Sequence, residues 1–169
     1  MNRRNVLAIS LVTASGLALM AGAALGQQRS LKDQVVGTWT VVSAYNILPD
    51  GKRLEANGPN PKGMIVFDTG GRFAQQIIDS TIPKFASNNR QQGTPDEFKR
   101  VAQGVIAYFG TYTVDAEQTI TFHIEYSSYP NMNDTSGKRE VKIAGDELQI
   151  VNRSAPSGGA AYLTFMRAK

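Results

Sequence analysis

Eight short segments of this chain carry the residue pattern of β-strands, and most of the turns between them are too short for a parallel crossover. Hairpin-length connections require antiparallel neighbours, and eight antiparallel strands suffice to close a barrel around one small ligand. The sequence therefore predicts an all-β fold, an eight-stranded antiparallel barrel, with a two-sheet sandwich as the competing architecture. The predicted strands are residues 35–45, 64–68, 72–78, 108–114, 119–127, 139–144, 147–152 and 160–167.

The segment 119–127 has the cleanest alternation of apolar and polar residues. One face of this strand would carry Ile120, Phe122, Ile124 and Tyr126, and the other Thr119, Thr121, His123 and Glu125. Because successive side chains of a strand point to opposite faces, we expect the apolar set inside the barrel. His123 and Glu125 should then point outward.

One helix is predicted between the third and fourth strands. Thr94 is a suitable N-cap, Pro95 fits the first helical position, and Glu97 completes a capping box. Apolar residues follow at helical spacing and predict a stripe that packs on the core, with a site for a binding partner as the alternative. This stripe consists of Phe98, Val101, Ala102, Val105 and Ile106.

The first 26 residues resemble an export signal. Arg3 and Arg4 precede the uncharged apolar run 6–25, and the small residues Ala24 and Gly26 favour cleavage before Gln27. An uncleaved membrane anchor is the alternative, and both the Sec and the twin-arginine routes remain open. We expect one mature domain, residues 27–169, which is periplasmic or secreted and has no membrane insertion once the signal is removed.

The composition excludes several classes of site. The chain has no cysteine and one histidine, which excludes a disulfide, a lipid-anchoring cysteine and a thiolate metal site. Its 18 basic residues exceed its 14 acidic ones, but two of the basic residues are Arg3 and Arg4 in the predicted signal. No dense basic run with interleaved aromatic residues occurs, so nucleic acid is not an expected partner. Neither a metal nor a cofactor is predicted.

Several motifs together resemble the bacterial lipocalin-like domain family. They are Gly37-Thr38-Trp39, the run 58–63, the turn 68–73, the run 108–112, and the shorter motifs at 123–125, 129–131, 138–139 and 145–148. The resemblance covers nearly all the predicted mature chain and implies a lipocalin-type barrel. In such barrels the tryptophan of Gly-x-Trp plugs the closed end and an arginine of the last strand packs across it. Gly37, Trp39 and Arg167 are the matching residues. Met132 departs from the pattern, because relatives carry tryptophan there, and methionine would make a softer wall.

Candidate ligand contacts come from the predicted inward faces. Aromatic rings and one arginine are expected to line the cavity: Tyr45, Phe67, Phe73, Tyr112, Tyr126 and Arg139. Arg139 shares strand parity with Val141 and Ile143, and an inward guanidinium suits a carboxylate or phosphate of a ligand. The alternative for Arg139 is a salt bridge to Glu125 or Asp134, and for the aromatic residues it is plain core packing.

Three functions are compatible with these features. The favoured one is binding of a small, largely apolar molecule, which is acidic if Arg139 contacts it. A second is a small enzyme without metal or cofactor, such as an isomerase or cyclase, with His123 and Glu125 as acid and base inside the cavity. A third is a filled barrel whose surface docks a protein. The sequence contains no signal for the oligomeric state.

Overall fold

The structure, a computed structural model, describes residues 30–115 and 119–169, so the predicted signal at 1–26 lies outside the described residues. The strands form one antiparallel sheet, and its last strand, β9 (Ala160–Arg167), pairs with its first, β1 (Gly37–Ile47). This closure confirms the predicted eight-stranded barrel over the sandwich. The other barrel strands are β3 (Lys62–Phe67), β4 (Arg72–Ile78), β5 (Val105–Val114), β6 (Thr119–Ser127), β7 (Thr135–Ala144) and β8 (Glu147–Asn152).

Two short elements at the start of the chain were not expected. Residues 31–35, including the predicted first residue of strand one, form the helix α1 (Leu31–Val35), whose N-cap is Ser30. The two-residue strand β2 (Arg53–Leu54) extends the sheet beside the end of β1. With β2 counted, the helix α2 (Pro95–Gly104) lies between β4 and β5, which are the third and fourth strands of the barrel itself.

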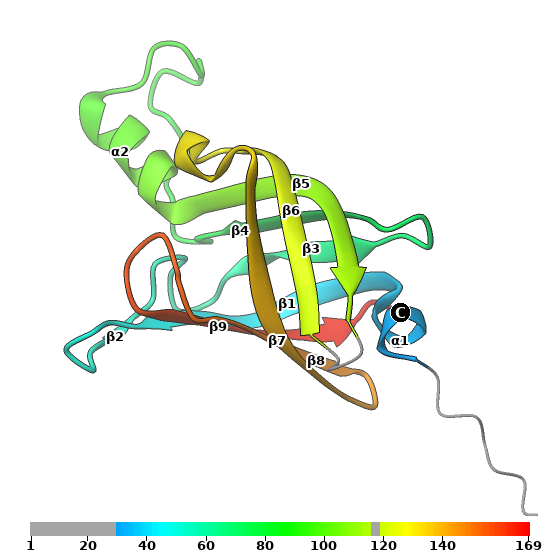
Figure 1. The fold of residues 1–169 in the computed structure, drawn as a ribbon. Helices are drawn as coiled ribbons and strands as arrows, with labels where there is room; N and C mark the ends of the chain where they lie inside the picture. Colours follow the sequence, from blue (N-terminus) through cyan, green and yellow to red (C-terminus); the bar gives the residue numbers. More distant parts are fainter. Residues whose placement is uncertain (1–29, 116–118) are drawn as a thin grey trace, which may run out of the picture.

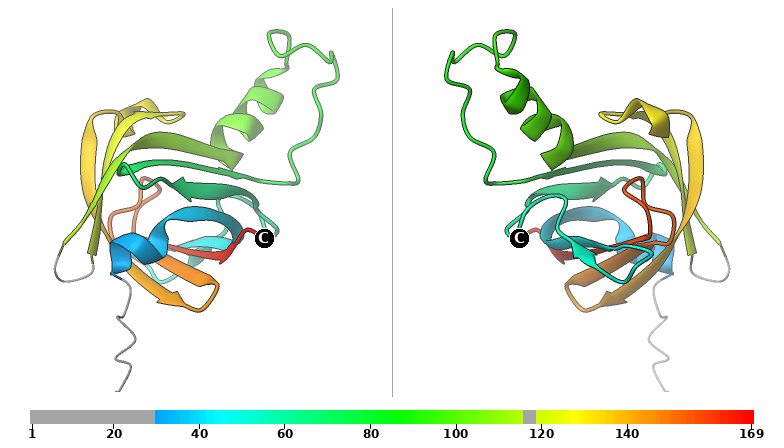
Figure 2. Two further views of the ribbon diagram at one scale, coloured as in Figure 1. Left: turned by 90° about the vertical axis from the view of Figure 1, so that its right-hand side faces the viewer. Right: turned by 90° about the vertical axis from the view of Figure 1, so that its left-hand side faces the viewer.

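The predicted start of α2 is confirmed, but its predicted apolar stripe is wrong. The Thr94 hydroxyl accepts a hydrogen bond from the Glu97 amide, and the Glu97 carboxylate accepts one from the Thr94 amide. Phe98 and Ala102 are exposed, however, and residues 105 and 106 already belong to β5. The helical spacing of apolar residues continues past the end of the helix at Gly104 into the first residues of β5. Figure 2 shows that α2 and the loop before it extend away from the barrel.

The two ends of the barrel differ in what surrounds them. At one end lie α2, β2 and the short 3-10 helix η1 (Pro130–Met132), and at the other lie α1 and the C-terminal end of β9 (Figure 1). Trp39 and Phe165 are completely buried in the core of the barrel. Within the described part of the chain, no helix has both the length and the apolar character needed to cross a bilayer.

Candidate ligand-binding cavity

A cavity of about 330 Å³ lies at the end of the barrel that carries α2 and η1. Its volume is at the lower end of the range of small-molecule pockets. Much of its wall is apolar and comes from strands on different sides of the barrel, together with the loop of η1. These apolar residues include Ile77, Val105, Ile106, Met132, Ile150 and Leu163.

Three buried polar side chains also face this cavity: Gln75 on β4, Tyr108 on β5 and Arg139 on β7. Their exposed fractions are 4%, 8% and 7%. Gln75 and Tyr108 are direct cross-strand partners. Burial raises the pKa of Tyr108 to about 12, although Arg139 and Gln75 both favour its charged form. The Tyr108 phenol is therefore neutral at physiological pH and keeps its O–H donor.

Arg139 is buried without an acidic partner. Its Nη1 donates to the Lys138 carbonyl oxygen at 2.9 Å, and its guanidinium lies over the Phe122 ring at 5.6 Å. Among the described residues, no carboxylate forms an ion pair with it. Burial lowers the pKa of Arg139, but a guanidinium stays charged at neutral pH because its ordinary pKa lies far above that range.

Gly137 provides the space for this guanidinium. A Cβ atom at this position would lie 2.6 Å from Nη1 of Arg139, which is closer than real contacts allow. The backbone of Gly137 is not left-handed, so an alanine would fit the strand and push only the arginine head group. The orientation of Arg139 therefore depends on the absence of a side chain two residues earlier in β7.

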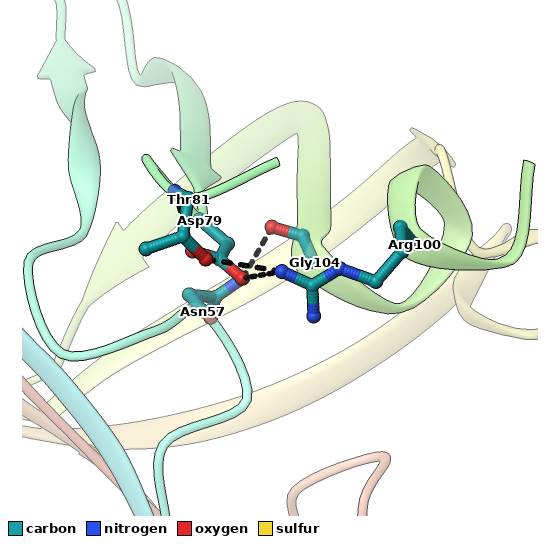
Figure 3. Close-up of polar contacts among 5 residues, drawn as sticks. All are labelled: Asn57, Asp79, Thr81, Arg100 and Gly104. Carbon is teal, nitrogen blue, oxygen red and sulfur yellow. Dashed lines mark hydrogen bonds and ion pairs between the residues drawn. The ribbon is translucent and has the colours of Figure 1, made fainter. Parts of the chain in front are cut away.

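A polar network holds the mouth of the cavity in place (Figure 3). The Asp79 amide and the Asn57 side chain both donate to the Gly104 carbonyl oxygen, at 2.8 and 3.2 Å. Arg100 donates to the Asp79 carboxylate and to the Thr81 hydroxyl, both at 3.0 Å. Hydrogen bonds from the Thr81 hydroxyl and amide, with help from Arg100, lower the pKa of Asp79. The network thus ties the loop before β3 and the end of α2, both of which line the cavity, to the end of β4.

Three of the predicted ligand contacts are part of the core instead. Phe67, Phe73 and Tyr112 are almost fully buried and do not line the cavity. Their rings pack together with Phe122: the Phe73 and Phe122 centroids are 4.2 Å apart, and those of Phe67 and Tyr112 are 5.0 Å apart. Of the six predicted contacts, only Arg139 lines the cavity.

Tyr45 and Tyr126 lie outside the barrel because a β-bulge precedes each of them. In β1 the pairing with β9 skips Val42, and Tyr45 then stacks on Tyr162 with centroids 5.3 Å apart. In β6 the pairing with β5 skips Glu125, and Tyr126 is 64% exposed. A bulge inserts one residue into the alternation, so every later side chain changes face.

His123 and Glu125, the alternative acid–base pair, are also outside the cavity. His123 is exposed, and its Nδ1 lies 2.9 Å from the Ser136 hydroxyl oxygen. Glu125 accepts two hydrogen bonds from the Arg72 guanidinium, at 2.9 and 3.2 Å. No group of three or more metal-ligating side chains gathers within the described residues. An acid–base mechanism would need this pair inside the cavity, and the structure places both side chains outside it.

Gly37, Trp39 and Arg167 meet at the end of the barrel beside α1. Trp39 is fully buried and donates from Nε1 to the Val35 carbonyl oxygen at 2.7 Å. The Arg167 guanidinium lies 3.9 Å from the Trp39 ring centroid and donates to the carbonyl oxygens of Gln34 and Val36. Gly37 has φ +124°, and a Cβ there would lie 3.1 Å from Arg167. This arrangement fastens α1 over the end of the barrel.

Two of the three buried polar residues of the cavity, Gln75 and Tyr108, were not among the predicted contacts. The sequence does indicate that Gln75 points inward, because the alternation of β4 places it on the same face as Phe73 and Ile77. A glutamine between two core residues is a buried polar group that needs a partner. Tyr108 lies on the same inward face of β5 as Tyr112. No feature of the sequence, however, distinguishes residues that line the cavity from residues that fill the core.

Comparison with known proteins agrees with this fold. The model of a family described as a lipocalin-like domain matches residues 36–168, which includes every strand. The chain belongs to this lipocalin-like domain family. A curated relative is the 4'-hydroxy-3'-methoxypropiophenone carrier protein ppsC of Aspergillus oryzae (strain ATCC 42149 / RIB 40), 27% identical over 85 residues. That match covers 46% of this chain and 77% of the relative.

The crystal structure of a variant of the fluorescent protein UnaG is similar to the structure of this chain. It has 14% sequence identity and a TM-score of 0.36, and the match covers 80% of this chain and 97% of that one. The assignment of the fold rests on the strand pairing and on the family model.

Proposed function

We propose that this protein binds a small, largely apolar molecule in the cavity at the α2 end of its barrel and pairs the acidic group of that molecule with Arg139. One observation carries the proposal. Arg139 is a buried cation that faces a mostly apolar cavity and has no carboxylate partner among the described residues. An unpaired buried charge is costly, so an anion that enters the cavity gains an unusually favourable contact.

The rest of the cavity suits an apolar body. Isoleucine, valine and leucine side chains form much of its wall, and the flexible side chain of Met132 adapts to different shapes. The Aspergillus oryzae relative is named as a carrier of a small aromatic ketone, which supports carriage of a small molecule rather than its conversion. The proposal also includes export: residues 1–26 act as a signal and the barrel works in the periplasm or outside the cell.

The proposal is tested by calorimetric titration with decanoate and with methyl decanoate, its neutral ester. Arg139→Met should weaken decanoate binding by about 1.5–3 kcal/mol, the usual value of a hydrogen bond to a charged group. Binding of the ester should stay the same. Gly137→Ala is a matched second variant, since it keeps the charge but displaces the guanidinium, and it should also weaken the acid selectively.

Two results would contradict the proposal. Equal losses for the acid and the ester would remove Arg139 from the site, and absence of binding by any acid in the wild type would remove the site altogether. Urea unfolding followed by Trp39 emission checks that both variants are folded.

A further inference from the structure

Gln75 is a buried polar group that the folded chain satisfies only in part: its side chain interacts with the Tyr108 phenol, but its carboxamide oxygen has no partner among the described residues. Its side chain lies between Phe73 and Ile77 on the inward face of β4 and lines the cavity. The carboxamide oxygen Oε1 is buried and receives no hydrogen bond from any described residue. Buried polar atoms almost always have a partner, so this atom marks a place where a donor from outside the chain is expected.

The position of Gln75 links it to the anion-binding groups. Its cross-strand partner is Tyr108, and the electrostatic influence of Arg139 reaches the same phenol. Three strands therefore bring together two donors, the Tyr108 hydroxyl and the Arg139 guanidinium, and one acceptor without a donor. We call Gln75, Tyr108 and Arg139 the inner polar cluster.

A simple carboxylate does not complement this cluster. Ionised carboxylate oxygens only accept hydrogen bonds, so they satisfy Arg139 and Tyr108 but offer nothing to the Gln75 oxygen. A ligand with an O–H or N–H group beside its acid satisfies all three side chains. The terminal torsion of a glutamine is broad and roughly two-fold, so the amide is able to turn its oxygen toward such a donor.

Building on the proposed function, we propose that the ligand is a hydroxy acid or a related molecule that carries a hydrogen-bond donor next to its acidic group. The acid contacts Arg139 and Tyr108, and the adjacent donor contacts Gln75. Sites built around a buried hydrogen-bonding group discriminate strongly against analogues that lack the matching group, because that group then stays unpaired. Gln75 is thus the residue that sets specificity, while Arg139 supplies the requirement for an anion.

The test compares decanoate with 2-hydroxydecanoate and 3-hydroxydecanoate by calorimetry, in the wild type and in Gln75→Met. At least one hydroxy acid should bind the wild type about 5- to 100-fold more tightly than decanoate, which is the range expected for satisfying a buried acceptor. Gln75→Met replaces the amide by an apolar chain of similar length and should abolish this preference. It should leave decanoate affinity unchanged or raise it.

Arg139→Met distinguishes failure of this inference from failure of the proposed function. It should weaken all three acids while the preference for the hydroxy acid persists. If the wild type binds decanoate and both hydroxy acids equally, the role of Gln75 is refuted, but the acid site stands. If a preference exists and Gln75→Met keeps it, the donor contacts another group and the inference is again wrong. Should Gln75→Met not fold, the comparison of the three acids in the wild type alone decides.

Discussion

Replacing Phe122 by alanine should strongly destabilise the barrel. The ring is fully buried and stacks on Phe73, with ring centroids 4.2 Å apart. The centroid of the Phe67 ring lies 5.9 Å away. Because its neighbours are fixed on β3 and β4, the hole left by the ring has little freedom to collapse. Truncation of a buried phenylalanine to alanine costs about 3–5 kcal/mol, and we expect the upper half of this range. That is a large part of the 5–15 kcal/mol that typically stabilises a domain.

Two residues of the same strand serve as matched controls. Tyr126→Ala removes a ring of similar size, but Tyr126 is 64% exposed and contacts only Phe109 among the described aromatic residues, at 6.2 Å. An aromatic pair of this kind contributes about 0.5–1.5 kcal/mol. His123→Ala removes an exposed side chain and should cost about 0.5 kcal/mol or less.

The assay is urea unfolding followed by the emission of Trp39, the only tryptophan of the chain and a fully buried one. The free energy of unfolding should fall in the order wild type, His123→Ala, Tyr126→Ala, Phe122→Ala. A Tyr126→Ala variant that loses as much stability as Phe122→Ala would refute the bulge in β6 and place Tyr126 inside. A larger loss for His123→Ala would refute the whole orientation of the strand.

The remaining predictions concern the two ends of the barrel and the pairing of β5 with β6. Arg167→Met should destabilise the protein by about 1.5–3 kcal/mol, because it removes the cation–π contact with Trp39 and two charged hydrogen bonds; no change in the urea midpoint would show that α1 is not fastened this way. Asp79 has a lowered pKa, so it should stabilise the fold above about pH 4, its unfolded value, and lose this effect as the pH falls through its folded pKa. The difference in the free energy of unfolding between the wild type and Asp79→Asn should therefore shrink as the pH falls. A difference that grows at low pH would contradict the network. Gly110→Ala places a Cβ against the backbone oxygen of His123 and should cost about 1–3 kcal/mol in thermal melts, whereas an unaffected melting temperature would rule out this close approach.

Regular alternation was enough to predict most of the barrel. The strand limits of β4, β6 and β8 agree with the predicted ones, because turn or loop residues that are recognisable in the sequence bound each of them. The capping box likewise predicted where α2 begins, since it depends only on neighbouring residues. Local patterns of this kind are visible in the sequence because the physical interactions behind them are local.

The bulges in β1 and β6 are the reason that two of the predicted ligand contacts, Tyr45 and Tyr126, point away from the cavity. Tyr45 and Tyr126 follow the alternation of their strands in the sequence, but the extra residues Val42 and Glu125 reverse their direction. A bulge is a property of the pairing between two strands, so one strand read alone does not reveal it. Arg139 was placed correctly because β7 pairs with both of its neighbours without a bulge.

The end of α2 and the extent of the filled core also depend on distant contacts. Val105 and Ile106 continue the helical spacing, but pairing with β4 draws them into β5. Phe67, Phe73 and Tyr112 face inward as predicted, and only the packing of rings from four strands shows that they fill the barrel rather than line the cavity. Inward direction alone does not separate a core residue from a ligand contact.

Native mass spectrometry of the protein purified from its own host tests the binding of an acidic small molecule most directly. The wild type should carry a small molecule with an acidic group, and Arg139→Met, purified in the same way and shown to be folded, should have lost it. A neutral molecule, or one retained equally by both proteins, would contradict the assignment of Arg139 as the group that holds the ligand.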